Sequence, residues 1–418
     1  MVIKMTRDRR NRRRYRIRLF DYINQKTFFA LLGVLIAVIA VLAYTSLRST
    51  SEMNKLVKQT EELNHKFQQI YQAKDGNGGE AGEQIDEANR LRLTILGDIY
   101  CTTEQISDSY SSTTHQYEFK RMFANIADLV KDADIAMGTI ETNFTKQDYT
   151  SGAKNNSPTE FADDWADMGL DIVNIATDHA YDYGAVGLAE TKNYWKNKGL
   201  TVVGDTLEES TARIYQSGRF KIAVLSYLQN GVGTGIENVP YYRYERAQAD
   251  IAEAKKNADY VIVFMHWSGL NQSYASTKET NLADELVAAG ADMIIGNHSN
   301  YVQQMEVKKN REGKNVFVAY SLGNYMLNTT DPHTKVELVL KVELRRSDVD
   351  GSVYLQQIDY VPIYAMDYGK SASPRFEYVD LRNKVESYKE TPTDEGEKAR
   401  YTQMKEALEW IEKIVVGG

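Results

Sequence analysis

The chain has 418 residues, of which 42% are hydrophobic and 26% are charged. This is an ordinary globular balance, with enough chain to bury a core in one large or two modest domains. Its single cysteine, Cys101, excludes an intrachain disulfide. The formal net charge of −8 argues against nucleic-acid binding.

The first 27 residues form a basic segment. Residues 1–20 contain Lys4 and eight arginines against Asp8 alone, so they carry about +8 and the rest of the chain about −16. Residues 28–47 contain no charge, and as a helix they would span about 30 Å, the thickness of a bilayer core. The pattern predicts a transmembrane helix that leaves residues 1–27 in the cytoplasm, against anionic lipid headgroups.

We therefore expect a single-pass protein of the cytoplasmic membrane, with its N-terminus inside and its main domain extracytoplasmic. The alternative is a cleaved signal peptide, for which Val41 and Ala43 would form a weak cleavage site. The basic region before the apolar run is long for a signal peptide, which favours a retained signal-anchor.

Residues 48–73 show a short heptad pattern, with apolar residues at Met53, Leu56, Leu63, Phe67 and Ile70. This spacing predicts a helical stalk or a weak coiled coil, through which the protein would form an oligomer. An amphipathic helix lying on its own domain or on lipid fits the same pattern. Residues 74–88 are polar and rich in glycine, which predicts a flexible linker.

From residue 91 onward, short apolar runs alternate with helical patterns. This alternation predicts an α/β domain over residues 89–345. Residues 346–418 add strands and a final helix, and antiparallel hairpins are expected with turns near Gly313 and Gly351. The predicted strands are residues 91–98, 134–141, 171–179, 221–228, 260–267 and 292–298, and the predicted helices include 161–170, 185–199 and 277–291.

Five of the apolar runs end in residues that can bind metal. In an α/β sheet, ligands bind beyond the carboxyl ends of the strands, so five such ends in one sheet would direct their side chains to one place. Three carboxylates and two imidazoles gathered there would repel one another or lose hydration unless cations lay among them. The pattern predicts one or two divalent ions (Mn, Fe, Zn or Mg), with the candidate ligands Asp98, Glu141, Asp178, His266 and His298.

Two residues beside these ligands have alternative interpretations. Cys101 lies three residues after Asp98 and could be a further ligand, but a buried structural thiol is the simpler interpretation. His179 directly follows Asp178, and an imidazole with a pKa near neutrality suits acid–base chemistry. A histidine at a helix start or in the core is the alternative for this position.

A set of motifs over residues 91–327 resembles the CapA family of bacterial capsule (poly-γ-glutamate) synthesis proteins. The motifs are TILGDIY, MGTIETNF, NIATDHAYDYG, VFMHWSG, IIGNHSNYVQQMEV and AYSLGNYM. That family belongs to the calcineurin-like metallophosphoesterase superfamily. The resemblance implies a two-sheet αββα sandwich with a dinuclear metal site, one N-terminal membrane anchor, and a role in synthesis, export or anchoring of poly-γ-glutamate.

The resemblance also implies roles for single residues. Asp98 would bind one ion, Glu141 would bridge both ions, and Asp178, His266 and His298 would bind the second. His179 would act as a general acid or stabilise the transition state. Trp267 and Asn297 are candidate substrate contacts. Tyr320 and Asn324, with Ser321 and Gly323, are expected to shape a tight strand-end turn near the pocket, and a direct contact of Tyr320 and Asn324 with substrate is the alternative.

The chain departs from the family pattern at three places. Thr177, Asp178 and His179 stand where the family usually has Asn-Asn-His. After His298, the chain has Ser299 and Asn300 in place of a second histidine, so only the amide oxygen of Asn300 would be a ligand there. The segment HWSGLNQ lacks the family's glutamate. A mononuclear or inactive site therefore stays open beside the dinuclear one.

Two functions follow from this pattern. One is a surface metal-dependent hydrolase, and the other is a non-catalytic subunit that guides or anchors an anionic capsule polymer. The chain has no GxxxxGK[ST] phosphate loop, so a membrane-bound ligase or export partner would have to drive ATP-dependent synthesis. A domain near −16 repels an anionic polymer over a Debye length of about 8 Å, so contact with that polymer would be local.

Overall fold

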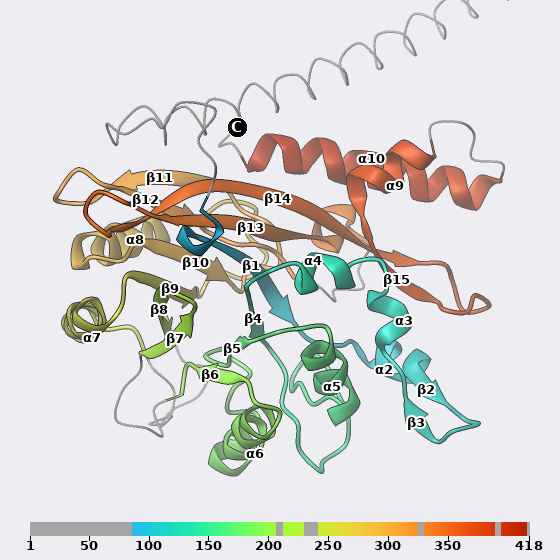
Figure 1. Ribbon diagram of the computed structural model, residues 1–418. Coiled ribbons are helices and arrows are strands. Elements are labelled where there is room, and N and C mark those ends of the chain that lie inside the picture. Colours follow the sequence, from blue (N-terminus) through green and yellow to red (C-terminus); the bar gives the residue numbers. More distant parts are fainter. Residues whose placement is uncertain (1–85, 206–211, 230–240, 325–329, 389–393, 416–418) are drawn as a thin grey trace, which may run out of the picture. The chain divides into compact units, whose positions relative to one another are not determined.

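The strands of the main domain form two sheets that pack face to face (Figure 1). The computed structural model describes residues 86–205, 212–229, 241–324, 330–388 and 394–415. The chain divides into two units after Glu62, and every described residue belongs to the second unit. The predicted cytoplasmic segment, transmembrane helix and stalk lie outside the described residues, as does most of the predicted linker. None of the helices within the described ranges has the length and hydropathy needed to span a bilayer.

The first sheet has seven strands in the order β15-β14-β13-β1-β4-β5-β6. Its parallel half consists of β1 (Arg90–Ile99), β4 (Ile135–Ile140), β5 (Ile172–Asn174) and β6 (Thr201–Val203). Its antiparallel half consists of β13 (Val336–Arg346), β14 (Val353–Asp367) and β15 (Phe376–Asp380). The β13–β14 pair is one of the two hairpins that the sequence predicted.

The second sheet has six strands in the order β11-β12-β10-β9-β8-β7. Its four central strands run parallel: β12 (Asn315–Ala319), β10 (Met293–Asn297), β9 (Tyr260–His266) and β8 (Phe220–Leu228). Antiparallel strands close both edges, namely β11 (Met305–Lys309) and β7 (Arg213–Ser217). All seven residues of β9 are buried, as expected for a strand covered on both faces.

Helices cover the outer face of each sheet, so the layers are αββα. The first sheet is covered by α2 (Thr103–Ser109), α3 (Lys120–Phe123), α4 (Ala127–Lys131), α5 (Thr159–Asp167) and α6 (Gly184–Asn197). The second sheet is covered by α7 (Tyr244–Asn257) and α8 (Thr277–Ala289). The predicted two-sheet architecture is confirmed.

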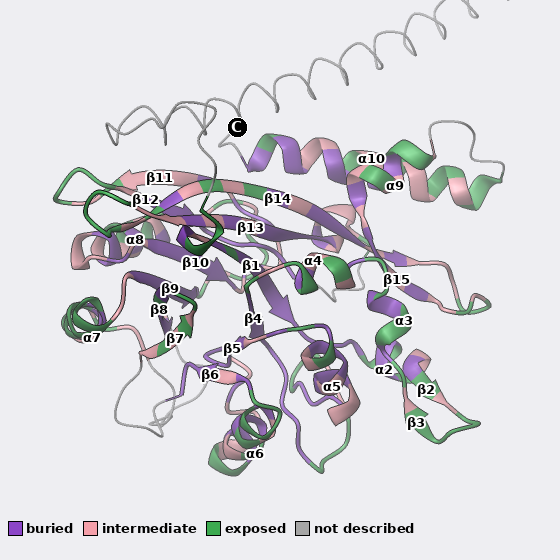
Figure 2. Cartoon of the chain, viewed as in Figure 1, coloured by how far each residue is buried: buried purple, intermediate pink, exposed green. Residues whose placement is uncertain are grey.

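The largest core lies between the two sheets, where Ile95 and Met137 of the first sheet and Phe264 and Ile295 of the second are all buried. The central strands are accordingly almost wholly buried in Figure 2. The C-terminal helices α9 (Leu381–Ser387) and α10 (Glu395–Ile414) add their apolar faces to this same core. A short hairpin of β2 (Tyr110–Ser111) and β3 (Gln116–Tyr117) forms a third, separate sheet.

One sequence prediction needs correction. The five predicted ligand-bearing strands do not share one sheet, because β1, β4 and β5 belong to the first sheet and β9 and β10 to the second. A strand's own sequence shows that it is buried but does not show which strand it pairs with. The ligands therefore meet at the junction between two sheets.

Candidate metal centre

Four side chains from the two sheets converge at the carboxyl ends of their strands. Glu141, Asp178, His266 and His298 each offer one ligand atom, and these four atoms lie within 4.8 Å of one another. Nε2 of His266 lies 3.0 Å from Asp178 Oδ1 and 3.7 Å from Glu141 Oε1. Nδ1 of His298 lies 3.6 Å and 4.0 Å from the same two atoms. The structure thus brings together four of the five candidate ligands in one group.

The backbone explains why these side chains meet. Glu141 directly follows β4, and its N–H donates to the carbonyl of Ile99 on β1. His266 is the last residue of β9, and His298 directly follows the neighbouring strand β10. Parallel neighbouring strands end at the same edge, which places the two imidazole rings 4.6 Å apart between centroids.

Asp98, the fifth candidate, lies beside this group. Its Oδ2 accepts a hydrogen bond of 2.8 Å from the backbone N–H of His298. Its Oδ1 is buried and has no hydrogen-bond partner among the residues that the structure describes. Burial and the neighbouring charge of Glu141 raise the pKa of Asp98 well above its usual range.

The centre needs positive charge to hold its carboxylates together. Burial alone would raise the pKa of Asp178, but hydrogen bonds from His266 and His298 outweigh burial and lower it. Burial also disfavours the charged form of His298, yet hydrogen bonds to Asp178 and Glu141 raise its pKa to about 10. His266, which is fully buried next to charged His298, has a lowered pKa. The neighbouring carboxylates thus keep His298 protonated, because their buried negative charge requires compensation.

This donor set fits a divalent cation. Two carboxylates and two imidazoles, all largely buried, are ligands typical of Zn²⁺, Fe²⁺ and Mn²⁺ sites. The buried Oδ1 of Asp98 is a further acceptor, to which no described residue donates a hydrogen bond. Cys101 is buried and lies outside the group, which agrees with the interpretation of a structural thiol.

His179 forms a hydrogen-bonded pair with Asp182, a residue that the sequence reasoning missed. Nδ1 of His179 lies 2.8 Å from Asp182 Oδ2, and the same oxygen accepts the N–H of Asn155 at 2.7 Å. Burial lowers the pKa of His179, but the hydrogen bond to Asp182 and nearby carboxylates raise it to about 9. Nε2 faces the centre, 4.0 Å from Asp178 Oδ2. The available signal was the three-residue spacing in HAYD, which is one helical turn.

The residues predicted as substrate contacts lie in different environments. Trp267 and Tyr320 are fully buried in the core beneath α8, where the indole N–H of Trp267 donates to the carbonyl of Tyr320 at 2.7 Å. Asn297 is buried beside the centre and donates to the hydroxyl of Thr139. Trp267 and Tyr320 therefore pack rather than line the metal group.

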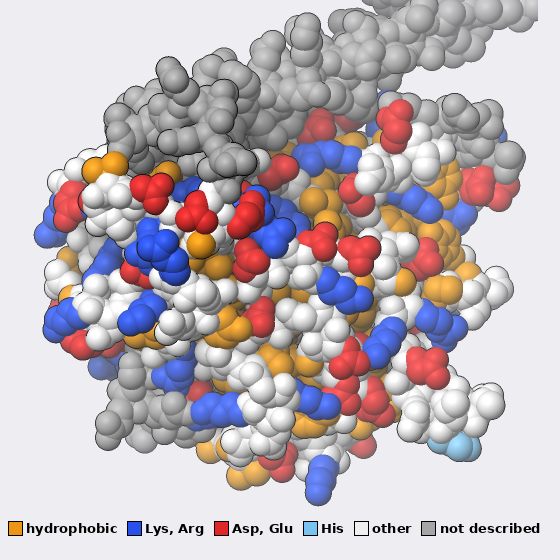
Figure 3. Space-filling view, viewed as in Figure 1, with side chains coloured by type: hydrophobic (Ala, Val, Ile, Leu, Met, Phe, Trp, Pro, Cys, Tyr) orange, Lys and Arg blue, Asp and Glu red, His pale blue; other side chains and the backbone are white. Residues whose placement is uncertain are grey.

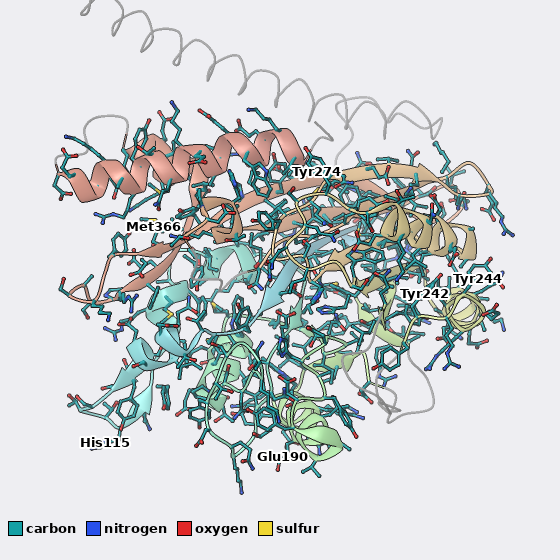
Figure 4. All side chains as sticks on the ribbon, turned by 180° about the vertical axis from the view of Figure 1, so that it is seen from behind. His115, Glu190, Tyr242, Tyr244, Tyr274 and Met366 are labelled. Carbon is teal, nitrogen blue, oxygen red and sulfur yellow. The ribbon has the colours of Figure 1, made fainter. Side chains whose placement is uncertain are left out.

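The side chains of Asn300 and Asn324 form a hydrogen bond with each other. The Nδ2 of Asn324 donates to Asn300 Oδ1 at 3.1 Å, and the Nδ2 of Asn300 donates to Asn271 at 3.0 Å. The amide oxygen predicted as a ligand thus accepts a hydrogen bond from a side chain. His115 lies on the exposed β2–β3 hairpin (Figure 4) and is not a member of the four-residue group.

Two known proteins are similar to this chain in sequence. The capsule biosynthesis protein CapA of Bacillus anthracis is 26% identical over 341 residues, which cover 77% of this chain and 78% of that protein. The PGA biosynthesis protein CapA of Bacillus subtilis (strain 168) is 27% identical over 270 residues, covering 62% of this chain and 68% of that protein.

Two solved structures show a weaker likeness. A phosphatase from Mycoplasma pneumoniae has a TM-score of 0.44 at 13% identity, covering 66% of this chain and 94% of that chain. The calcineurin-like phosphoesterase YfkN from Bacillus subtilis has a TM-score of 0.39 at 15% identity, covering 78% and 99%. Scores this low carry no functional inference.

The model of the family described as bacterial capsule synthesis protein PGA_cap matches residues 92–329, more than half of the chain, so the chain belongs to that family.

Proposed function

We propose that this protein is a metal-dependent hydrolase that acts on an anionic capsule polymer of the poly-γ-glutamate type during its synthesis or anchoring. The observation that carries the proposal is the four-ligand group of Glu141, Asp178, His266 and His298, with His179 beside it. Membership of the capsule synthesis family supports the biological role. The names of the two Bacillus relatives support it as well.

The proposed cofactor is one or two divalent ions held by the four-ligand group, with Asp98 beside it. Two imidazoles among the ligands favour Zn²⁺, Fe²⁺ or Mn²⁺ over Mg²⁺. When bound, such an ion acidifies a coordinated water and polarises the bond to be cleaved. The buried ligand side chains exclude bulk water, which strengthens every charge interaction at the centre.

His179 is the proposed proton donor. Its Nδ1 is fixed by Asp182, so the ring cannot rotate freely and Nε2 stays directed at the centre. The carbonyl of His179 also accepts a hydrogen bond of 2.8 Å from Nδ2 of Asn143, and this bond holds the backbone of His179 in place. A protonated imidazole in this position can give its proton to the leaving group.

An anionic substrate needs local positive charge, because the chain outside its basic N-terminus is strongly acidic. On the face shown in Figure 3, basic and acidic side chains are interspersed. Lys154, however, is exposed and directly precedes Asn155, which contacts Glu141, and its ammonium lies 5.2 Å from the centroid of the Tyr183 ring. Within the described ranges, no carboxylate forms an ion pair with it. It is a suitable contact for a substrate carboxylate or phosphate.

Hydrogen bonds on both sides hold the backbone of Lys154 near the centre. The hydroxyl of Thr150 donates to the carbonyl of Lys154 at 2.9 Å. The next residue, Asn155, donates its side-chain amide to the carbonyl of Glu141 at 2.8 Å and its backbone N–H to Asp182. The ammonium therefore extends from a segment that is attached to both a candidate ligand and the partner of His179.

We further propose that residues 28–47 anchor the protein in the cytoplasmic membrane, with the main domain outside and a membrane-bound ligase or exporter as partner. The support is the charge-free run next to a basic segment. Membrane fractionation and protease protection of the full chain, compared with a chain lacking residues 1–47, test this placement. Recovery of the full chain in the soluble fraction would contradict it.

Metal content tests the centre directly. The purified full chain should contain about one or two equivalents of a divalent ion, and His266→Ala should lose most of it because an inner ligand is removed. His115→Ala is the matched control, since this histidine lies on the exposed hairpin. Plasma mass spectrometry gives the metal content. Equal metal in His266→Ala and the parent would contradict the assignment.

Turnover tests the role of His179. His179→Ala and Asp182→Asn should lower kcat by about 100-fold while metal content stays unchanged, because proton donation typically contributes a factor of this size. Release of p-nitrophenol from bis(p-nitrophenyl) phosphate and shortening of poly-γ-glutamate are the two assays. A metal-loaded parent that cleaves neither probe and still supports capsule formation would favour the non-catalytic subunit instead.

The exposed ammonium of Lys154 leads us to expect that substitutions at Lys154 and at Lys146 differ in their effect on substrate affinity. Lys154→Ala should raise the KM for poly-γ-glutamate by about 3- to 10-fold, with kcat little changed, and added salt should reduce the difference. Lys146→Ala is the control, because this lysine is also exposed on the same loop, whereas the ammonium stacked over the Tyr183 ring is that of Lys154. Equal effects of the two substitutions would show that only the overall charge matters.

A further inference from the structure

Glu337 is a buried acid for which the proposed chemistry has no role. It lies on β13 with 1% of its surface exposed. Its Oε1 accepts a hydrogen bond of 2.6 Å from the backbone N–H of Gly97. Its Oε2 is buried, and no hydrogen-bond partner for it lies within the described part of the chain. Burial raises its pKa well above the usual range. Burying a carboxyl costs free energy, so an apolar residue would be expected here unless the acceptor is needed.

The geometry of β1 explains the need for this acceptor. The ladder between β1 and β13 stops at Ile95 and Leu340, and the pairing of β1 with β4 shifts register between Ile95 and Asp98. The N–H of Gly97 therefore has no strand partner in the β13 ladder. The Glu337 carboxyl supplies that partner.

The turn that follows β12 fills the gap between β1 and β13. The N–H of Leu338 donates to the carbonyl of Leu322 at 2.7 Å, and the N–H of Asp98 donates to the carbonyl of Gly323 at 3.3 Å. A Cβ on Gly97 would lie 2.6 Å from the Gly323 carbonyl and 2.9 Å from Glu337 Oε1. This close packing leaves no room for a side chain at position 97.

A continuous series of contacts leads from Glu337 to the metal centre. Glu337 holds the backbone of Gly97, and the next residue, Asp98, accepts the N–H of His298 through Oδ2. His298 adopts a φ of 91°, a left-handed conformation that a histidine rarely takes without support from its surroundings. We propose that Glu337 is a positioning residue, whose carboxyl fixes the irregular end of β1 so that Asp98 and His298 are held in place for the metal. This inference rests on the proposed metal centre.

Substitutions of Glu337 should change metal affinity according to whether an acceptor reaches Gly97. Glu337→Gln keeps an acceptor of the same length and should leave the Kd for Zn²⁺ within about twofold of the parent. Glu337→Asp shortens the side chain and Glu337→Met removes the acceptor, and both should weaken binding by about 10-fold or more, as loss of an outer support of a metal ligand does. Calorimetric titration of the full chain with Zn²⁺ gives the Kd.

The control separates positioning from stability. Val339→Ala truncates a buried residue on the same strand without touching Gly97, so it should lower Tm and leave the Kd unchanged. In an Asp98→Ala background, which removes the acceptor of the His298 N–H, Glu337→Asp should have much less effect on the Kd than in the parent, because its influence passes through the side chain of residue 98.

The outcomes are distinct. Parent-like Zn²⁺ affinity in Glu337→Asp, or equal weakening by Val339→Ala, would overturn the positioning role while leaving the proposed metal centre intact. Absence of Zn²⁺ binding by the parent would refute the metal centre, and this inference with it. Loss of affinity in Glu337→Asp with recovery in Glu337→Gln would establish the role.

Discussion

The structure around the candidate centre depends on one electrostatic constraint, which is that buried carboxylates require positive charge nearby. Glu141 and Asp178 share a small volume with two imidazoles, and Asp98 lies beside them with a bare oxygen. The raised pKa of His298 and the lowered pKa of Asp178 are two consequences of the same attraction. A bound divalent cation would supply this positive charge in place of imidazole protons. The clustering of carboxylates and imidazoles is thereby connected to the proposed metal chemistry.

The scaffold supplies the rigidity that such a centre needs. His266 and His298 come from adjacent parallel strands whose residues are almost all buried, so their backbones have little freedom. On the other sheet, β1 ends irregularly, and it is held there by contacts from the turn after β12 and from Glu337. The candidate ligands are thus held from both sheets, at the junction between them.

The proposed substrate must approach a domain with an unfavourable overall charge. Long-range attraction cannot bring an anionic polymer to an acidic surface, so recognition falls to the metal and to exposed cations close to it. Lys154 meets this condition through the loop that also contacts Glu141 and Asp182. Family membership agrees with a capsule polymer as the substrate, and the local chemistry gives a reason why it could bind.

The sequence by itself determined an α/β domain and the identity of the four clustered candidate ligands, because apolar runs and the polar residues that end them are local properties. The two-sheet αββα class was expected only from the resemblance of the motifs to the CapA family. The sequence could not determine that these strands divide between two sheets, since pairing depends on partners distant in the chain. Glu337 was missed for the same reason, because its contact with Gly97 exists only after folding. Asp182 lies only three residues after His179, so its pairing with that histidine had a local signal, but its contact with Asn155 also depends on the fold. The buried positions of Trp267 and Tyr320 were likewise decided by tertiary packing, because nothing local tells an aromatic residue in a core from one in a pocket.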